Sequence, residues 1–180
     1  MKLNLGSGTK KYGGYLNIDL NNHQDTDYVL NLEVDKLPFD DNSVTHVIAH
    51  HILEHLGDGF IYCLKELYRV CCNNTVIDIR VPHPRHDIFL IDPTHKRPIY
   101  PHTLDMFSKA RNKRDVDNNG SETPLGLIHN VNFEVIDHSF ILDPYWQPKF
   151  AMMSEDECEH IARSLNNVIT EILIKLLVIK

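Results

Sequence analysis

The residues of this chain with the clearest capacity for chemistry are histidines. The sequence holds 12 histidines among 180 residues, and several of them gather between positions 83 and 102. Imidazole changes its charge near neutral pH, so a histidine is a natural acceptor for a proton that a reaction must remove. The candidates in this segment are His83, His86 and His95, and the competing interpretation is that these imidazoles cap backbone groups of a loop.

The same segment also contains side chains of the kind that bind metals. Imidazole nitrogens and carboxylate oxygens are suitable ligands, but their spacing here matches no standard site, so we expect no metal. The residues weighed for this alternative are His83, His86, Asp87, Asp92 and His95.

A second group of candidate residues begins near the first residue of the chain. The stretch LNLGSG predicts a short strand that runs into Gly6-Ser7-Gly8, where the backbone can approach a ligand and reach positive φ. Asp19 ends the next predicted strand and would lie at the carboxyl edge of the sheet, where a carboxylate can accept hydrogen bonds from ribose hydroxyls. The alternative is a tight turn beside an unrelated aspartate.

The elements that must position these residues are strands separated by helices. Residues 59–71 (GFIYCLKELYRVC) place apolar side chains on one helical stripe, which favours a helix packed on a sheet. Strands joined by such crossovers indicate a largely parallel sheet of the α/β class. The predicted strands in this part of the chain are residues 2–6, 15–20, 27–32, 44–50 and 75–81.

The second half of the chain is predicted to begin with a proline-rich loop or cap over residues 82–102. A helix over residues 103–113, capped by Thr103, and a polar turn over residues 115–124 follow. Two further runs, 131–142 and 168–180, are predicted as strands; the last also fits a helix, but its β-branched residues favour a strand. Between them, residues 154–165 predict a helix, in which Ser154 and Glu157 have the spacing of a capping box.

Composition limits the functional classes. The net charge is −7 and the basic residues form no long stripe, so nucleic acid is not expected as the main partner. Four cysteines without a CxxC pair, and no signal peptide or apolar run of membrane-spanning length, predict a reduced, soluble, cytoplasmic protein without a membrane partner. We expect one domain over residues 1–180.

The stretch from Asp27 to Asp58, DYVLNLEVDKLPFDDNSVTHVIAHHILEHLGD, narrows the interpretation. With the glycine bend, the sequence resembles the class I S-adenosylmethionine-dependent methyltransferases, especially small predicted members of bacterial and phage type, over residues 2–104. The motifs RVPHP and DPTHKR fall within that range. The resemblance implies a Rossmann-like methyltransferase fold with a seven-stranded, mostly parallel sheet and an antiparallel last strand. It also implies S-adenosylmethionine as cofactor and S-adenosylhomocysteine as product.

The resemblance further implies roles for individual residues. The glycine bend would border the methionine and ribose, and Asp19 would hold the ribose diol. Where the class usually has an acidic residue for the adenine amino group, this chain has an asparagine, so we expect lower cofactor affinity, and Asp35 competes for that role. The full cofactor set is Gly6, Ser7, Gly8, Asp19, Leu20, Asn31, Leu32 and His50, with His50 and His51 facing the sulfonium.

One departure from the class concerns its first helix. Eight residues separate Gly6 from Tyr15, whereas a parallel crossover usually takes a dozen or more. The helix after the first strand is therefore expected to be missing or reduced to a turn, and no helix is expected ahead of that strand. With its N-terminal helices trimmed, the cofactor's methionine side would be open unless a partner subunit, such as a second copy in a homo-oligomer, covers it.

The function predicted from sequence is methyl transfer to oxygen or nitrogen of a small-molecule or sugar-like acceptor. A histidine would assist deprotonation, and the three catalytic candidates are His83, His95 and His51. One alternative is a non-catalytic regulatory or partner subunit that binds the same cofactor; a nicotinamide-dependent reductase is disfavoured because the third glycine is absent. Further candidates for the acceptor pocket are Arg85, Lys96, Arg97, Tyr145 and Trp146.

Overall fold

Seven strands form a single sheet in the computed structural model, which describes all 180 residues. The strand order is β3-β2-β1-β4-β5-β7-β6, and β7 runs antiparallel to both of its neighbours while the other pairs are parallel. The predicted seven-stranded sheet with an antiparallel last strand is confirmed. The strands are β1 (Lys2–Leu5), β2 (Leu16–Asp19), β3 (Tyr28–Val29), β4 (Val44–His50), β5 (Cys71–Pro82), β6 (Phe133–Leu142) and β7 (Ile169–Val178).

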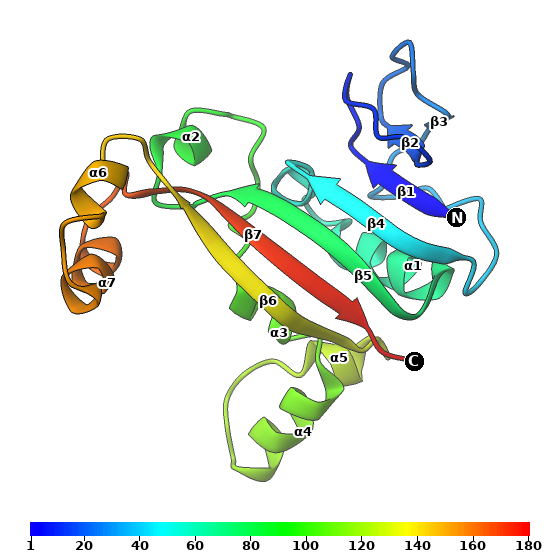
Figure 1. The fold of residues 1–180 in the computed structure, drawn as a ribbon. Coiled ribbons are helices and arrows are strands. Elements are labelled where there is room, and N and C mark those ends of the chain that lie inside the picture. Colours follow the sequence, from blue (N-terminus) through cyan, green and yellow to red (C-terminus); the bar gives the residue numbers. More distant parts are fainter.

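The helices gather behind one face of the sheet and at its ends (Figure 1). The longest, α1, buries Phe60, Leu64 and Leu67 in the main core, as its apolar stripe predicts. No helix is both long and apolar enough to cross a bilayer. The helices are η1 (Leu53–His55, a 3₁₀ turn), α1 (Phe60–Val70), α2 (Asp87–Leu90), α3 (Pro101–Asp105), α4 (Lys109–Asp117), α5 (Leu125–Ile128), α6 (Gln147–Phe150) and α7 (Glu155–Ser164).

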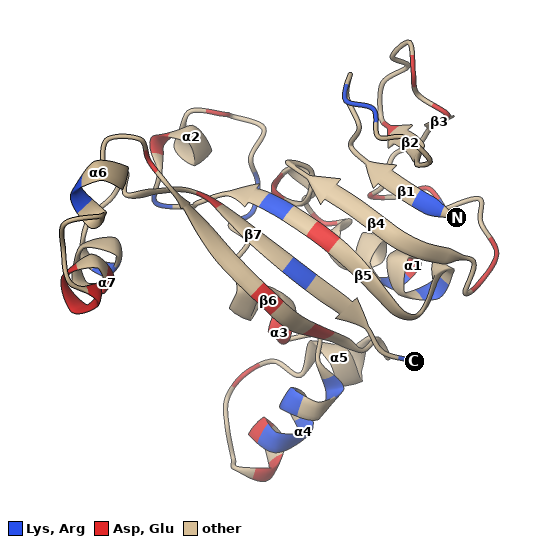
Figure 2. Cartoon of the chain, in the orientation of Figure 1, with Lys and Arg blue, Asp and Glu red and all other residues tan.

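The opposite face of the sheet carries no helix over its central strands (Figure 1). Turns alone connect β1 to β2, which confirms the missing first crossover helix. Acidic and basic positions alternate across β5, β7 and β6 (Figure 2), and they pair there. The pairs include His46 Nε2 of β4 with Asp78 Oδ2 of β5 at 3.1 Å, and Lys175 Nζ of β7 with Asp137 Oδ2 of β6 at 3.2 Å. This polarity allows the face to contact water.

The predicted helix over residues 103–113 is wrong as a single element. Pro101 starts α3 two residues earlier, and Thr103 Oγ1 accepts the backbone N–H of Tyr100 from inside the helix. Ser108 then caps a separate helix, α4, through the N–H of Arg111 at 3.3 Å, and α4 extends into the predicted polar turn. The loop over residues 82–102 likewise contains α2 and the start of α3.

The last two predicted elements have the expected type. Ser154 and Glu157 form the capping box of α7, in which each side chain accepts a backbone N–H from the other residue's position. The final apolar run is strand β7 and not a helix. It lies between β5 and β6, where its alternate residues enter the core.

Two of the four free cysteines are buried at the junction of α1 and β5. Cys63 lies on α1, and Cys71 begins β5 directly after the last residue of that helix. Desolvation raises the pKa of each thiol to about 12. Both cysteines therefore remain protonated at neutral pH and serve as apolar core residues.

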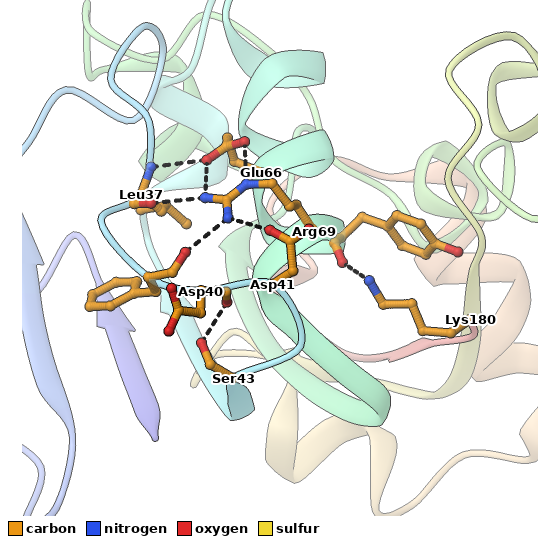
Figure 3. Close-up of polar contacts among 9 residues, drawn as sticks. Leu37, Asp40, Asp41, Ser43, Glu66, Arg69 and Lys180 are labelled. Carbon is orange, nitrogen blue, oxygen red and sulfur yellow. Dashed lines mark hydrogen bonds and ion pairs between the residues drawn. The ribbon is translucent and has the colours of Figure 1, made fainter.

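Arg69 joins α1 to the connection between β3 and β4 (Figure 3). Its Nε and Nη2 donate to the two carboxylate oxygens of Glu66 at 2.9 and 2.7 Å. Its Nη1 donates to Asp41 Oδ1 and to the Phe39 carbonyl, both at 2.8 Å, and Nη2 donates to the Leu37 carbonyl at 2.8 Å. One planar guanidinium thus fixes a whole loop against the helix.

We expect Arg69→Met to lower the free energy of unfolding by about 2–3 kcal/mol, because it leaves several oxygens of this loop without a donor. Urea denaturation measures the change. Arg163→Met removes only an exposed pair with Glu159 and should change stability by less than about 0.5 kcal/mol.

The same substitution should alter the pH dependence of stability. The hydrogen bond from Arg69 lowers the pKa of Glu66 in the folded state. The contribution of Glu66 is therefore present above the usual glutamate range and is lost as the pH falls through the lowered value. If the free energy of unfolding fell equally on acidification in wild type and in Arg69→Met, this account would be contradicted.

Candidate cofactor cleft and acceptor edge

A cleft of about 630 Å³ lies at the carboxyl ends of β1, β2 and β4. Its walls come from the glycine bend, the end of β2, residues 30–33 after β3, the turn after β4 and residues 93–96. In open α/β sheets this edge is where ligands bind. Five segments that are distant in sequence therefore meet around one space.

The glycine bend forms the floor of the cleft through its backbone. Gly6 and Gly8 have φ values of +60° and +52°, which residues with a Cβ rarely adopt. A Cβ on Gly6 would lie 2.7 Å from Cβ of Ile52, another cleft residue, whereas a Cβ on Gly8 would meet no atom within 4 Å. Ser7 is buried between them and its Oγ has no hydrogen-bond partner. Gly6 lines the cleft, while Ser7 and Gly8 shape the bend behind it.

Asp19 lies beside the bend, as expected. Its Oδ2 accepts the backbone N–H of Gly8 at 2.8 Å, and its Oδ1 accepts that of Asn21 at 2.8 Å. The carboxylate therefore holds the ends of β1 and β2 together, and each oxygen keeps a further lone pair for a ligand. Next to it, Leu20 lines the cleft with an exposed apolar side chain.

The loop after β3 brings Asn31 and Leu32 to the cleft. Asn31 Oδ1 accepts the N–H of Glu33 at 3.0 Å, and Asp35 Oδ2 accepts the N–H of Asn31 at 2.8 Å. Asp35 braces this loop and does not line the cleft, so it is disfavoured as the adenine contact. Glu33 does line it, and its Oε1 accepts the N–H groups of Gly57 and Gly59 before α1.

The two histidines at the end of β4 line different cavities, so the structure does not place His50 at the cofactor cleft as predicted. His50 lines a separate cavity on the helix-free face together with Asp78 and Arg80. His51 has left the strand with a φ of +54° and lines the cofactor cleft. Its Nε2 lies 3.0 Å from Glu171 Oε1, and its Nδ1 lies 3.5 Å from Glu54 Oε1.

His83 is also corrected as a residue of this cleft. It lines a second cavity of about 590 Å³ near α7, together with Arg85 and Tyr100. Desolvation, with Arg85 nearby, lowers the pKa of His83 to about 4, so its imidazole is neutral at neutral pH. Its Nδ1 accepts the N–H of Arg85 at 3.3 Å. His83 thus satisfies a loop backbone group, as the competing interpretation proposes.

His86 and His95 also bond to backbone groups, but only His95 is near the cleft. His86 caps α2 through the N–H of Ile88 and pairs with Asp143 at 3.3 Å. His95 is stacked on Phe89, with ring centroids 5.0 Å apart, and contacts His55, which lines the cleft. The histidines and aspartates weighed as a metal set therefore do not form one group.

Only one of the predicted acceptor-binding cations reaches the cleft. Lys96 lines it, whereas Arg97 donates to the carbonyls of Leu56 and Gly57 and lies over the ring of Phe60. Arg85 donates to carbonyls at the end of α7. Tyr145 and Trp146 do not line the cleft; their rings meet edge to face beside α6.

Sequence does not predict Glu33 or Thr94 as cleft residues, although both line the cleft. His55 and Lys96, which also line it, lie in the motifs LEHL and DPTHKR, about 40 positions apart. Only the folded chain shows that these two motifs share a wall.

Comparison with known proteins agrees with this geometry. The sequence profile of a family described as "Methyltransferase domain" matches residues 5–77, which span β1 to the middle of β5. This match confirms the resemblance to S-adenosylmethionine-dependent methyltransferases, the class whose cofactor is S-adenosylmethionine. No curated protein matches the sequence.

Solved structures share the fold at low sequence identity. A SAM-dependent methyltransferase from Archaeoglobus fulgidus is 20% identical with a TM-score of 0.55, over 97% of this chain and 85% of that one. The YcgJ protein from Bacillus subtilis is 13% identical with a TM-score of 0.55, over 99% and 92%. The [4+2]-cyclase SpnF is 14% identical with a TM-score of 0.55, over 99% and 74%. A shared fold with a cyclase means that the reaction must be argued from the site.

We expect Asp19→Ala to weaken binding of S-adenosylhomocysteine by about 1–3 kcal/mol, through loss of charge-assisted hydrogen bonds. Isothermal titration calorimetry measures the affinity. Asp25→Ala is the matched control, because Asp25 pairs with Lys11 outside the cleft. Since Asp19 also holds two backbone N–H groups, Asp19→Asn tests the charge with less disturbance. Unchanged affinity in both Asp19 variants would remove this residue from cofactor binding.

Proposed function

We propose that this protein transfers a methyl group from S-adenosylmethionine to an oxygen or nitrogen atom of a small-molecule or sugar-like acceptor. The observation that carries the proposal is the composition of a single cleft. It holds the bend and carboxylate expected to bind the nucleoside together with two imidazoles, those of His51 and His55. Methyl transfer needs in-line placement of the acceptor and, for a protonated acceptor, a base.

The residues of the cleft fit the cofactor. Asp19 keeps a further lone pair on each carboxylate oxygen for the ribose diol, with His23 Nε2 3.6 Å from Oδ1, and Gly6 brings the glycine bend to the cleft. Leu20 and Leu32 supply apolar surface for the adenine, and Asn31 offers a side-chain amide beside them. When bound, the cofactor supplies an electrophilic methyl group on its sulfonium.

His51 is the best-placed proton acceptor among the three candidates. Glu171 Oε1 lies 3.0 Å from Nε2, whereas Glu54 Oε1 lies 3.5 Å from Nδ1. We assign the ring proton to Nε2, which has the shorter contact, and the lone pair to Nδ1. Arg80 bonds to Glu171 and fixes the carboxylate. In the proposed step, the acceptor's proton moves to Nδ1 while its oxygen or nitrogen takes the methyl group. S-adenosylhomocysteine then leaves.

The rim of the cleft supports a polar acceptor. His55, Thr94 and Lys96 line the same cleft as His51, and all three carry hydrogen-bonding groups. Such a rim favours an acceptor with hydroxyl or amino groups over an apolar one, because unpaired polar groups at a binding site cost affinity. This is the support for a sugar-like or similarly polar small molecule.

We expect His51→Ala to lower methyl-transfer turnover by roughly 10²- to 10⁴-fold, with S-adenosylhomocysteine affinity within about twofold of wild type. The measurement is formation of S-adenosylhomocysteine with a pooled metabolite extract, paired with calorimetry. His46→Ala is the control and should keep its turnover, because His46 lies on β4 and pairs with Asp78 outside the cleft.

Two results would contradict the proposal in different ways. Equal turnover in His51→Ala and wild type would remove His51 as the base. Tight cofactor binding by wild type without product from any acceptor pool would favour the non-catalytic subunit instead.

A further inference from the structure

We propose that Glu54, His55 and His95 bind a divalent transition-metal ion at the wall of the cofactor cleft. One ligand atom from each of the three side chains lies within 4.8 Å of the other two. This proposal revises the expectation of no metal, and it uses a different set of residues from the one the sequence suggested. Only His95 is common to both sets.

Glu54 is the residue that most needs a partner. Its side chain is 1% exposed, neither carboxylate oxygen accepts a hydrogen bond, and one further imidazole nitrogen, His51 Nδ1, lies 3.5 Å from Oε1. No lysine or arginine pairs with it, whereas the nearby Glu171 is bonded to Arg80. A buried ionised carboxylate without compensation is costly, and such groups in native proteins are normally paired or bound to a metal. A cation between Glu54 and the two imidazoles would remove that cost.

The tautomer of His95 suits metal binding. Its Nδ1 lies 2.8 Å from the carbonyl of Phe89, which can only accept, so Nδ1 carries the proton. The lone pair is therefore on Nε2. A metal-binding histidine typically donates its other N–H to a carbonyl or carboxylate in this way.

His55 reaches the same tautomer, with its proton on Nδ1, through a chain of two hydrogen bonds. The Thr94 hydroxyl donates to Asp92 Oδ1 at 2.6 Å, and the Thr94 backbone N–H donates to the same oxygen at 2.8 Å. The Thr94 oxygen is then an acceptor, and His55 Nδ1 donates to it at 2.9 Å. The lone pair of His55 is consequently on Nε2, as in His95.

The two segments that carry the ligands are fixed to each other by their backbones. The carbonyl of Glu54 accepts the N–H groups of Lys96 at 2.8 Å and Arg97 at 3.2 Å. The rings of His55 and His95 lie 4.7 Å apart between centroids. The ligand atoms are thus held together before any ion binds, which lowers the entropic cost of binding.

The ligand set indicates which ions would bind. Two imidazoles and one carboxylate favour Zn²⁺, Co²⁺ or a similar divalent ion over Mg²⁺ or Ca²⁺, which prefer oxygen ligands only. Three protein ligands leave at least one coordination position open, as in catalytic zinc sites. Because His55 lines the cleft, that position would be available to an acceptor hydroxyl, whose deprotonation the ion would assist. This last role rests on the proposed function, whereas metal binding does not.

The test is titration of EDTA-treated protein with Zn²⁺ by calorimetry, in the absence of any methyl donor. Wild type should bind one Zn²⁺ per chain, and Co²⁺ should produce a visible absorption band on the same protein. His95→Ala should weaken the affinity by at least about 100-fold, and Thr94→Val, which frees the His55 ring, by about 10- to 100-fold. His160→Ala, an exposed histidine on α7, should leave the affinity unchanged.

Glu54→Gln provides a readout that loss of structure cannot imitate. It replaces an unpaired buried charge by a neutral amide, so the metal-free variant should have a Tm equal to or above that of metal-free wild type. The increase in Tm that Zn²⁺ causes in wild type should be lost. Absence of one-to-one binding in wild type, or unchanged affinity in His95→Ala, would overturn the proposal. S-adenosylhomocysteine binding, measured separately, shows whether the cofactor assignment fails independently.

Discussion

The main-chain carbonyl of Glu54 organises the acceptor side of the cleft. By accepting the N–H groups of Lys96 and Arg97, it holds the long segment after β5 against the turn after β4. The Arg97 guanidinium reinforces the contact by donating to two further carbonyls of that turn. Every side chain proposed to act on the acceptor is on one of these two segments. Loss of this contact would separate them, although the sheet behind would remain intact.

Sequence predicts well what is set by local periodicity. The glycine bend and Asp19 were located because short strands, turn-forming residues and the acid at a strand end are all visible within 18 residues. The antiparallel last strand was anticipated from its β-branched residues and from the resemblance. The same local signals gave Ser154 as a helix cap, and the structure has both hydrogen bonds of its capping box.

Sequence predicts less where a single backbone angle or a long-range contact decides which cavity or partner a side chain reaches. His50 and His51 are neighbours in sequence, yet only His51, which has a positive φ, lines the cofactor cleft, and no pattern in the sequence requires this. His83, His86 and His95 are close in sequence, yet the end of β5, the cap of α2 and the return toward η1 send them to different environments. Conversely, Glu54 and His95 are 41 positions apart and come together only through tertiary contacts.

The position of Cys63 and Cys71 has a consequence for following the motions of this protein. Both thiols are enclosed where α1 meets β5, and burial keeps them in the unreactive protonated form. An alkylating reagent such as iodoacetamide can modify them only when the helix separates from the sheet. The rate of their modification therefore reports how often α1 separates from the sheet. The more exposed Cys72 and Cys158 supply an internal reference for the reagent.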